Sequence, residues 1–254
     1  MSAGRPDRHA GIPQYSLVQI LAVWAAAAIP MGVLSWLVAP WLADRLGGEE
    51  PLVQALLICI PLGLIWECAL VVILTRREQG TLSWPRLRDG LWLRPPRDPR
   101  SGRTGGRVWL WVLPFMAIFG LGFVLPGIPA PSPRGLAEFL GTGAGEAFFQ
   151  GAWGWLAVVV VFAVFNTVLG EELLFRGLLL PRMRGVFGRY DWVANGVLFA
   201  CYHLHTPWVI PTALINVFAI SYPSRRYQSA WMGILVHSTQ SVGLIAIVVV
   251  LVVS

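Results

Sequence analysis

Residues 148–180 read FFQGAWGWLAVVVVFAVFNTVLGEELLFRGLLL, an apolar run with two adjacent acids and one base near its C-terminal end. A membrane-spanning helix needs about 20 predominantly apolar residues, and this run is long enough. Each charged side chain at the centre of a bilayer costs about 2.5–3.5 kcal/mol on insertion scales, so such residues usually face a bundle interior and mark function. The run therefore predicts a membrane helix that brings Glu171, Glu172 and Arg176 to an internal polar site.

The rest of the chain is equally apolar. Hydrophobic residues make up 56% of the 254 residues and charged residues only 13%, against about 25% charged in a typical soluble domain. This composition excludes an ordinary soluble enzyme, a disordered chain and a collagen-like chain. It predicts an all-α, polytopic integral membrane protein of about seven transmembrane helices with an intramembrane polar site. The predicted spans are residues 16–42, 52–74, 108–125, 148–180, 192–206, 208–222 and 230–253.

The basic residues indicate how the chain lies in the membrane. All 19 of them are arginines, and against 13 acids they give a net charge of +6. Nearly all lie between apolar runs, as in cytoplasmic loops, so we expect membrane lipid as a partner and no nucleic acid. Arg5, Arg8 and nine arginines of the stretch 76–107 fall on the side of the N-terminus, whereas Arg45 and Arg134 fall on the other side. The positive-inside rule then predicts a cytoplasmic N-terminus and an outside C-terminus. A set of basic residues made only of arginine also indicates a GC-rich genome and a bacterial plasma membrane.

The order of the spans divides the chain into two regions. Residues 1–147 are expected to form N-terminal membrane helices with a cytoplasmic loop at about 75–107. In this loop, apolar residues alternate with arginines, as in an amphipathic segment on a membrane surface. The apolar residues are Leu82, Trp84, Leu87, Leu91, Trp92 and Leu93. Residues 148–254 are expected to form the core helices that hold the polar site.

Helix geometry assigns different positions to the two adjacent acids. At about 100° per residue, Glu171 and Glu172 point in different directions. Glu172 and Arg176 are spaced i, i+4 with the acid first, which is the better orientation for an ion pair on one face. We therefore expect Glu172 to be the structural partner of Arg176. Glu171 is left to face the cavity, where it can take a proton from water.

Histidines supply the other candidate functional groups. His203 and His237 lie in the last apolar runs, and neutral imidazoles together with a carboxylate can bind zinc. Glu171, His203 and His237 are therefore candidate metal ligands. Neither H-E-x-x-H nor H-x-x-E-H is present, so the spacing leaves open whether the site holds no cofactor or a divalent metal such as zinc. His205 is two positions from His203, and on a helix it is expected to face away from it as a structural histidine.

One more acid lies in an apolar run. Glu67, between Trp66 and Cys68 in the second predicted span, either pairs with an arginine or lines the cavity. A catalytic role for Glu67 is the less favoured of these interpretations.

Three motifs, on three different apolar segments, resemble those of one known family. Residues 171–176 read E-E-x-x-x-R, residues 199–203 read F-x-x-x-H, and residues 237–241 begin with His237 and end with Ser241. In this order they resemble the CPBP family, the CAAX-protease and bacteriocin-processing intramembrane endopeptidases, also called the abortive-infection family. The resemblance covers about residues 148–245, and Leu91-Trp-Leu-Arg94 is similar to a short segment that often precedes the core.

The resemblance implies an intramembrane endopeptidase that hydrolyses peptide bonds of membrane-associated or prenylated peptides. It implies that Glu171 and His203 activate the attacking water, that His237 and Ser241 stabilise the oxyanion, and that Glu172 and Arg176 support the site. The prenyl-protein proteases of the family carry Asn where this chain has Ser241. Serine is a shorter donor, and the loss of one oxyanion donor can cost about 10²–10³ in rate.

Two other functions use the same residues. A protein that binds a peptide or a lipid-linked ligand without cutting it, as in bacteriocin immunity, would fit the serine at position 241. An ion or proton carrier would use the intramembrane acids and histidines. The lack of a visible internal repeat counts against the carrier.

Overall fold

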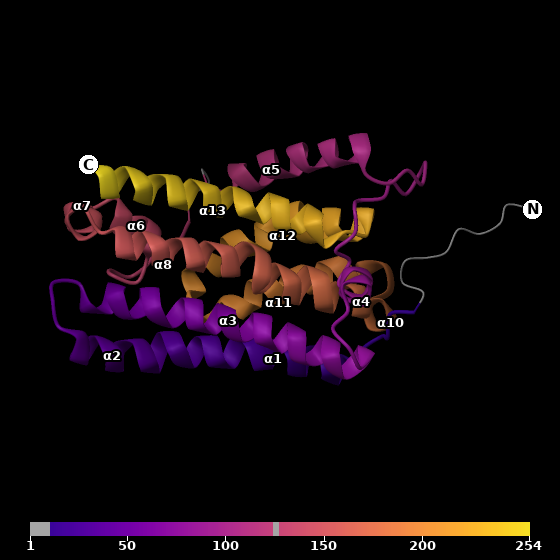
Figure 1. The fold of residues 1–254 in the computed structure, drawn as a ribbon, viewed down its shortest axis with the longest axis horizontal. Coiled ribbons are helices and arrows are strands. Elements are labelled where there is room, and N and C mark those ends of the chain that lie inside the picture. The colour runs from indigo at the N-terminus through magenta and orange to yellow at the C-terminus, as the bar shows by residue number, and fades with distance from the viewer. Residues whose placement is uncertain (1–10, 124–126) are drawn as a thin grey trace, which may run out of the picture.

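The chain forms a bundle of helices in the computed structural model, which describes residues 11–123 and 127–254. Within these two stretches there is no β-strand, which confirms the all-α class. The long helices run side by side and end at two opposite ends of the molecule (Figure 1). Arg5, Arg8 and the last two residues of the predicted span 108–125 lie outside the described residues.

Within residues 11–123 and 127–254, four helical segments are long and apolar enough to cross a membrane. They are Leu17–Leu46, containing α1 (Leu17–Val33) and α2 (Ala39–Leu46); α3 (Pro51–Gln79); Trp153–Arg182, containing α8 (Trp153–Val164) and α9 (Leu180–Arg182); and α13 (Ala230–Val253). The other three predicted spans correspond to shorter helices. These are α5 (Val112–Leu121), α11 (Asp191–Tyr202) and α12 (Ile210–Tyr227).

Short helices lie at the two ends of the bundle (Figure 1). The end near the N-terminus carries α4 (Trp84–Gly90) and α10 (Arg184–Phe187), and we call it the inner end. The opposite end, near the C-terminus, carries α6 (Leu136–Leu140) and α7 (Gly143–Phe149), and we call it the outer end.

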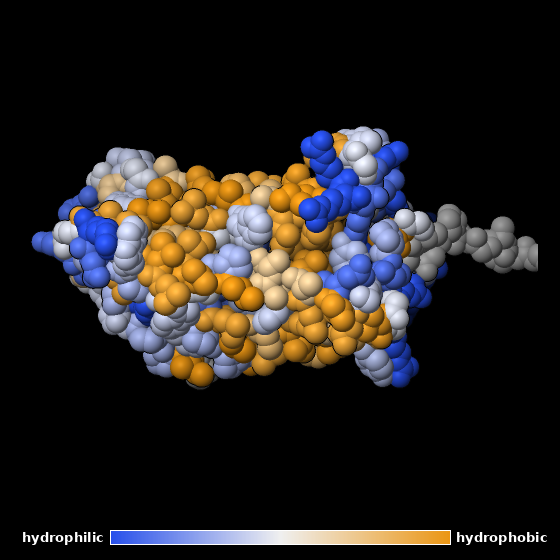
Figure 2. Space-filling view, turned by 90° about the horizontal axis from the view of Figure 1, so that it is seen from below, coloured by the Kyte–Doolittle hydropathy of each residue, from blue (hydrophilic) through white to orange (hydrophobic). Residues whose placement is uncertain are grey.

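The surface has the pattern of a membrane protein. Figure 2 shows apolar side chains over the middle of the molecule and hydrophilic side chains at both ends. Many large apolar side chains are exposed, among them Val18 on α1 and Val242 on α13. So many exposed apolar side chains form an apolar belt around the middle of the molecule that suits contact with lipid chains. Together with the four apolar spans, it identifies an integral membrane protein.

A buried arginine ties the inner end together. The Nη2 atom of Arg182 lies 2.6 Å from Oε2 of Glu78 at the end of α3. Its Nη1 atom donates to the carbonyl of Gly90 at 3.0 Å, and Tyr15 donates its hydroxyl to Glu78. An arginine presents five donors in a fixed fork, so one side chain can join three segments. These contacts hold the ends of α3, α4 and α9 together at the inner end.

The loop at the inner end differs in part from the predicted amphipathic segment. Trp84 is exposed, as expected at a membrane surface, but Leu91 and Trp92 are buried. Trp92 packs with Leu180 of α9 and Ile234 of α13, and its carbonyl accepts from the backbone N–H of Ala230 at 2.9 Å. The prediction that this part of the loop lies on the membrane surface was therefore wrong. Its apolar residues close the inner end of the bundle, where they bury more area than a surface position offers.

Candidate active site

An irregular stretch of the span Trp153–Arg182 positions the two adjacent acids. Two π-helical turns, Phe165–Leu169 and Leu173–Leu179, flank Gly170. A Cβ atom on Gly170 would lie 2.6 Å from the carbonyl oxygen of Phe165 and 2.9 Å from that of Leu64 on α3. These distances exclude a side chain without a backbone shift. Glycine thus lets this segment touch α3, and π-helical turns of this kind are frequent at functional sites.

Glu172 lies at the centre of a buried ionic cluster. Its Oε1 atom is 2.9 Å from Nη1 of Arg176 and 3.0 Å from Nδ1 of His237 on α13. The side chains of Glu172 and Arg176 are fully buried, so the attraction between them is little screened by solvent. The ion pair predicted from the i, i+4 spacing is therefore present. The contact with His237, which lies 65 residues further along the chain, was not predicted.

Arg176 is held by a second set of contacts that the sequence analysis missed. Its Nη2 atom donates to Oγ of Ser221 on α12 at 3.3 Å, and that hydroxyl donates to Oδ1 of Asn195 on α11 at 3.1 Å. The guanidinium carbon also lies 4.0 Å from the ring centroid of Phe199, a cation–π geometry. Polar residues at Asn195 and Ser221 inside apolar helices were the available signal. Arg176 therefore connects three helices around Glu172.

A glycine on α13 makes room for Glu172. A Cβ atom on Gly233 would lie 2.5 Å from Oε2 of Glu172 and 2.7 Å from Oγ of Ser224. The helix axis can approach the buried carboxylate only because position 233 has no side chain. Gly233 is one turn before His237, so the same close approach brings the imidazole to Glu172.

His203 lies at the end of α11, where the helix gives way to a 3-10 turn, His203–His205. Its Nδ1 atom is 2.9 Å from the carbonyl oxygen of Phe199. A carbonyl only accepts, so this hydrogen bond assigns the proton to Nδ1 and leaves Nε2 of a neutral ring as an acceptor. Nε2 is the nitrogen that remains for a water molecule or a substrate.

The position of His205 contradicts its predicted orientation. Its ring stacks on that of His203, with centroids 5.5 Å apart and planes inclined by 23°. The prediction assumed a continuous α-helix through both residues. The α-helix ends at Tyr202, and the tighter turn that follows brings the two rings onto one side.

Glu171 is buried next to these groups but is bound by none of them. Its Oε2 atom has no hydrogen-bond partner among the described residues. Arg176 lies close enough to interact electrostatically with both Glu171 and His203. Tyr202 lies close enough to interact in the same way with Glu171. The structure thus gathers Glu171, Glu172, His203 and His237 around the guanidinium group of Arg176. It shows no hydrogen bond between the described side chains of Glu171 and His203.

Ser241 is placed one turn after His237 but points its hydroxyl to another helix. Its Oγ atom donates to Oγ1 of Thr167 at 3.1 Å. Ser238 donates to the same threonine oxygen at 3.4 Å. The hydroxyl of Ser241 is therefore engaged with the first π-helical turn in this conformation.

The arrangement of donors does not fit a metal ion. Among the described residues, no group of three or more His, Cys, Asp or Glu side chains is disposed to hold one. His237 directs its Nδ1 atom to Glu172, and His203 directs its own to a backbone carbonyl. The candidate ligands Glu171, His203 and His237 therefore do not form such a group in this structure.

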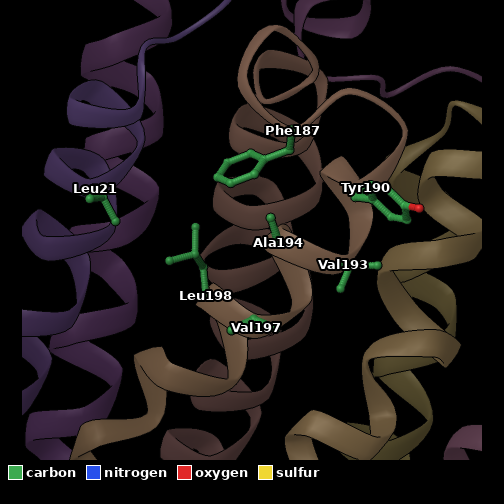
Figure 3. A pocket seen from close by; sticks show the side chains of 7 residues that line it. All are labelled: Leu21, Phe187, Tyr190, Val193, Ala194, Val197 and Leu198. Carbon is green, nitrogen blue, oxygen red and sulfur yellow. The ribbon is translucent and has the colours of Figure 1, made fainter.

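A separate apolar pocket of about 340 Å³ lies between α1 and α11, beside α10 and close to the inner end (Figure 3). Its lining is Leu21, Phe187, Tyr190, Val193, Ala194, Val197 and Leu198. None of the candidate site residues lines it. This pocket offers apolar contacts and no catalytic group.

Comparison with known families agrees with the geometry of the site. Residues 152–243 match the family model described as Type II CAAX prenyl endopeptidase Rce1-like. The matched range contains all six candidate residues from Glu171 to Ser241, and it agrees with the predicted resemblance to the CPBP intramembrane proteases. The match supports a protease role and a membrane location in general terms. No curated protein and no solved structure matches the chain.

Proposed function

We propose, from the family model that residues 152–243 match, that the chain is an intramembrane endopeptidase of the CAAX-protease type. Its substrates are membrane-associated or prenylated peptides, and the reaction is peptide-bond hydrolysis by an activated water molecule. One observation carries the proposal: Glu171 is a buried acid with an unpartnered oxygen, and it lies beside a cluster whose other members are held in place by hydrogen bonds. Burial of an acid without a hydrogen-bond partner costs free energy. Such residues inside membrane proteins therefore usually mark a site that acts on a ligand.

Glu171 and His203 activate the water. The Glu171 carboxylate is the general base, which takes a proton from the water as its oxygen attacks the scissile carbonyl carbon. The Nε2 atom of His203 accepts a hydrogen bond from the other O–H of the water and so orients it, because Nδ1 already donates to Phe199. The proton then passes from Glu171 to the leaving amine as the peptide bond breaks.

His237 stabilises the negative charge on the carbonyl oxygen. Its Nδ1 atom donates to Glu172, and in the protonated ring Nε2–H is the free donor for the oxyanion. Glu172 orients the ring through this contact, and Arg176 holds Glu172 in position. Ser241 is the second oxyanion donor in this proposal, and it must turn its hydroxyl away from Thr167 to act.

The test is cleavage by purified protein reconstituted in lipid vesicles. A quenched prenylated peptide and a panel of membrane proteins are given to the wild type and to Glu171→Gln, each with and without a chelator. We expect the wild type to cleave and Glu171→Gln to lose at least about 100-fold in kcat. Glu146→Gln is the matched control, because Glu146 is an exposed acid on α7 at the outer end. Equal cleavage by the wild type and a folded Glu171→Gln would overturn the proposal. Loss of cleavage in the presence of chelator would overturn the metal-free mechanism and indicate a metal-dependent one.

The second candidate function is binding without cleavage, as in bacteriocin immunity. The observation that favours it is the hydroxyl of Ser241, which donates to Thr167 and not into the site. In that case, vesicles of wild type and Glu171→Gln would retain a prenylated peptide equally well and leave it intact.

A further inference from the structure

A second buried acid, Glu67 on α3, belongs to none of the groups described above. Its side chain is fully buried, and neither carboxylate oxygen has a hydrogen-bond partner among the described residues. Glu67 also lies outside the range 152–243 that matches the family. A carboxyl group without partners inside a protein costs several kcal/mol. Such a group is retained only where something outside the fold gives it a function.

The packing of the helices places Glu67 beside Glu171. The backbone of Gly170 touches α3 at the carbonyl of Leu64. Glu67 is three residues after Leu64, so it is on the same side of α3, and Glu171 directly follows Gly170. The two carboxyl groups are electrostatic neighbours. Since Oε2 of Glu171 is also unpartnered, three carboxylate oxygens are free at this contact.

Tyr202 completes the group with a hydroxyl. Its side chain is fully buried, and its hydroxyl lies beside the carboxyl group of Glu67. It is an electrostatic neighbour of both Glu67 and Glu171, and its ring centroid is 5.2 Å from that of His203. The group therefore faces the residues that activate water in the proposed reaction. The other ionisable groups around it are Glu172, Arg176 and His205.

We propose that Glu67 and Tyr202 are positioning residues that hold the water molecule on which Glu171 acts. A water molecule has two hydrogens to donate and two lone pairs to accept with. The water donates one hydrogen to Glu171 and the other to Nε2 of His203, and it accepts from the hydroxyl of Tyr202. The oxygen of that hydroxyl accepts in turn from the carboxyl group of Glu67, so Glu67 orients Tyr202 and Tyr202 orients the water. Buried waters usually make about three such hydrogen bonds. This inference rests on the proposed function, because it assigns its water to that reaction.

The inference is tested in the same vesicle assay with three variants. Glu67→Leu removes the carboxyl group at similar volume, Glu67→Gln keeps a side chain that can hydrogen-bond to Tyr202, and Tyr202→Phe removes the hydroxyl that donates to the water. We expect kcat to fall by about 10- to 100-fold in Glu67→Leu and Tyr202→Phe with KM unchanged, and by less in Glu67→Gln. The double variant should lose no more than about the larger single loss, because both residues act through one water. Cys68→Ala, at the next position of α3, is the matched control.

Thermal unfolding of the same proteins in detergent separates positioning from a structural role. Replacement of a fully buried carboxyl group by an apolar side chain of similar volume should leave Tm of Glu67→Leu unchanged or higher. A fall of kcat in proportion to a fall of Tm would overturn the inference in favour of a structural role, as would an unchanged kcat in Glu67→Leu. If the Glu67 variants cleave normally while Glu171→Gln does not, this inference fails and the proposed function stands. If the wild type cleaves nothing, both fail.

Discussion

At the scale of single residues, the site depends on one arginine and its contacts with three other residues. Arg176 pairs with Glu172, donates to Ser221 and lies over the ring of Phe199. A lysine carries the same charge, but it has neither the second planar N–H group nor the flat face that these contacts use. The geometry of Arg176, and not only its charge, therefore fixes Glu172 and through it His237.

The first prediction concerns this geometry. Arg176→Lys should lower kcat by at least about tenfold, because Glu172 and His237 lose their alignment while the charge is kept. Kinetics in vesicles with a prenylated peptide measure the loss. Arg107→Lys, at an exposed position before α5 at the inner end, is the matched control. Wild-type kcat in Arg176→Lys would show that charge alone supports the site.

The second prediction concerns the serine at position 241. Ser241→Asn should raise kcat by about tenfold or more if the short hydroxyl limits oxyanion stabilisation, because the longer amide reaches further from α13. The measurement is the ratio of kcat values under saturating peptide. Ser238→Asn is the control, since Ser238 also contacts Thr167 but precedes the predicted motif position. A lower kcat in Ser241→Asn would mean that contact with Thr167 is what position 241 contributes.

Local spacing predicted part of the site and missed the rest for a physical reason. The i, i+4 rule found the pair of Glu172 and Arg176, because both residues are on one helix. The contact of Glu172 with His237 depends on how α13 packs, which no local spacing encodes. The orientation of His205 was wrong because the helix ends one residue before His203. The placement of Glu67 beside Glu171 depends on the close contact at Gly170.

At the scale of helices, the lengths of the apolar runs predicted which segments form spanning helices. The sequence did not predict how these helices contact one another. The four longest predicted runs correspond to the four segments of spanning length, because burial of backbone hydrogen bonds in lipid requires them to be helical. The shorter runs became α5, α11 and α12, with α11 and α12 separated by turns between His203 and Val209. Leu91 and Trp92 were misplaced because a pattern of Leu, Trp and Arg does not distinguish lipid from a protein groove as the apolar partner.

The third prediction tests the packing of α13 against Glu172. Gly233→Ala puts a methyl group within 2.5 Å of the carboxylate, and overpacking of this kind costs about 1–3 kcal/mol. We expect a lower Tm and a loss of kcat together. Gly243→Ala, on the same helix with nothing within 4 Å of the new Cβ, should change neither. Equal behaviour of the two variants would contradict the packing argument.

At the scale of the whole molecule, the two ends of the apolar belt must face opposite sides of the membrane. The inner end carries most of the arginines, and we propose that it is cytoplasmic. The fourth prediction is that Ser254→Cys reacts with an impermeant maleimide in intact cells, whereas Ser101→Cys reacts only after the membrane is opened. The unmodified chain, whose three cysteines lie in the helices, is the control. The reverse pattern would place the C-terminus inside.

The last prediction follows from how the outer loop, the segment before α6 that carries Arg134, contacts the bundle. The Nη1 atom of Arg134 donates to the carbonyl of Ser35 at 3.3 Å, within the π-helical turn Leu34–Val38, and the guanidinium lies 4.1 Å from the ring centroid of Trp36. The indole N–H of Trp36 donates to the carbonyl of Leu204 at 2.9 Å, beside the turn that carries His203. Burial lowers the pKa of the Arg134 guanidinium, but it stays charged at neutral pH.

These contacts join the segment that carries Arg134 to the turn that carries His203, on the outer side of the site. We therefore expect substrate to enter from the inner end or laterally from the lipid. Arg134→Ala should then lower the unfolding free energy by about 1 kcal/mol through loss of the cation–π contact, while kcat and KM stay unchanged. Thermal unfolding and vesicle kinetics measure the two effects. Arg45→Ala is the matched control, because Arg45 also stacks on a tryptophan, Trp41, at the outer end but contacts only its own helix. If Arg134→Ala lowers KM or raises kcat, the outer loop restricts substrate entry, and the peptide arrives from the outer side.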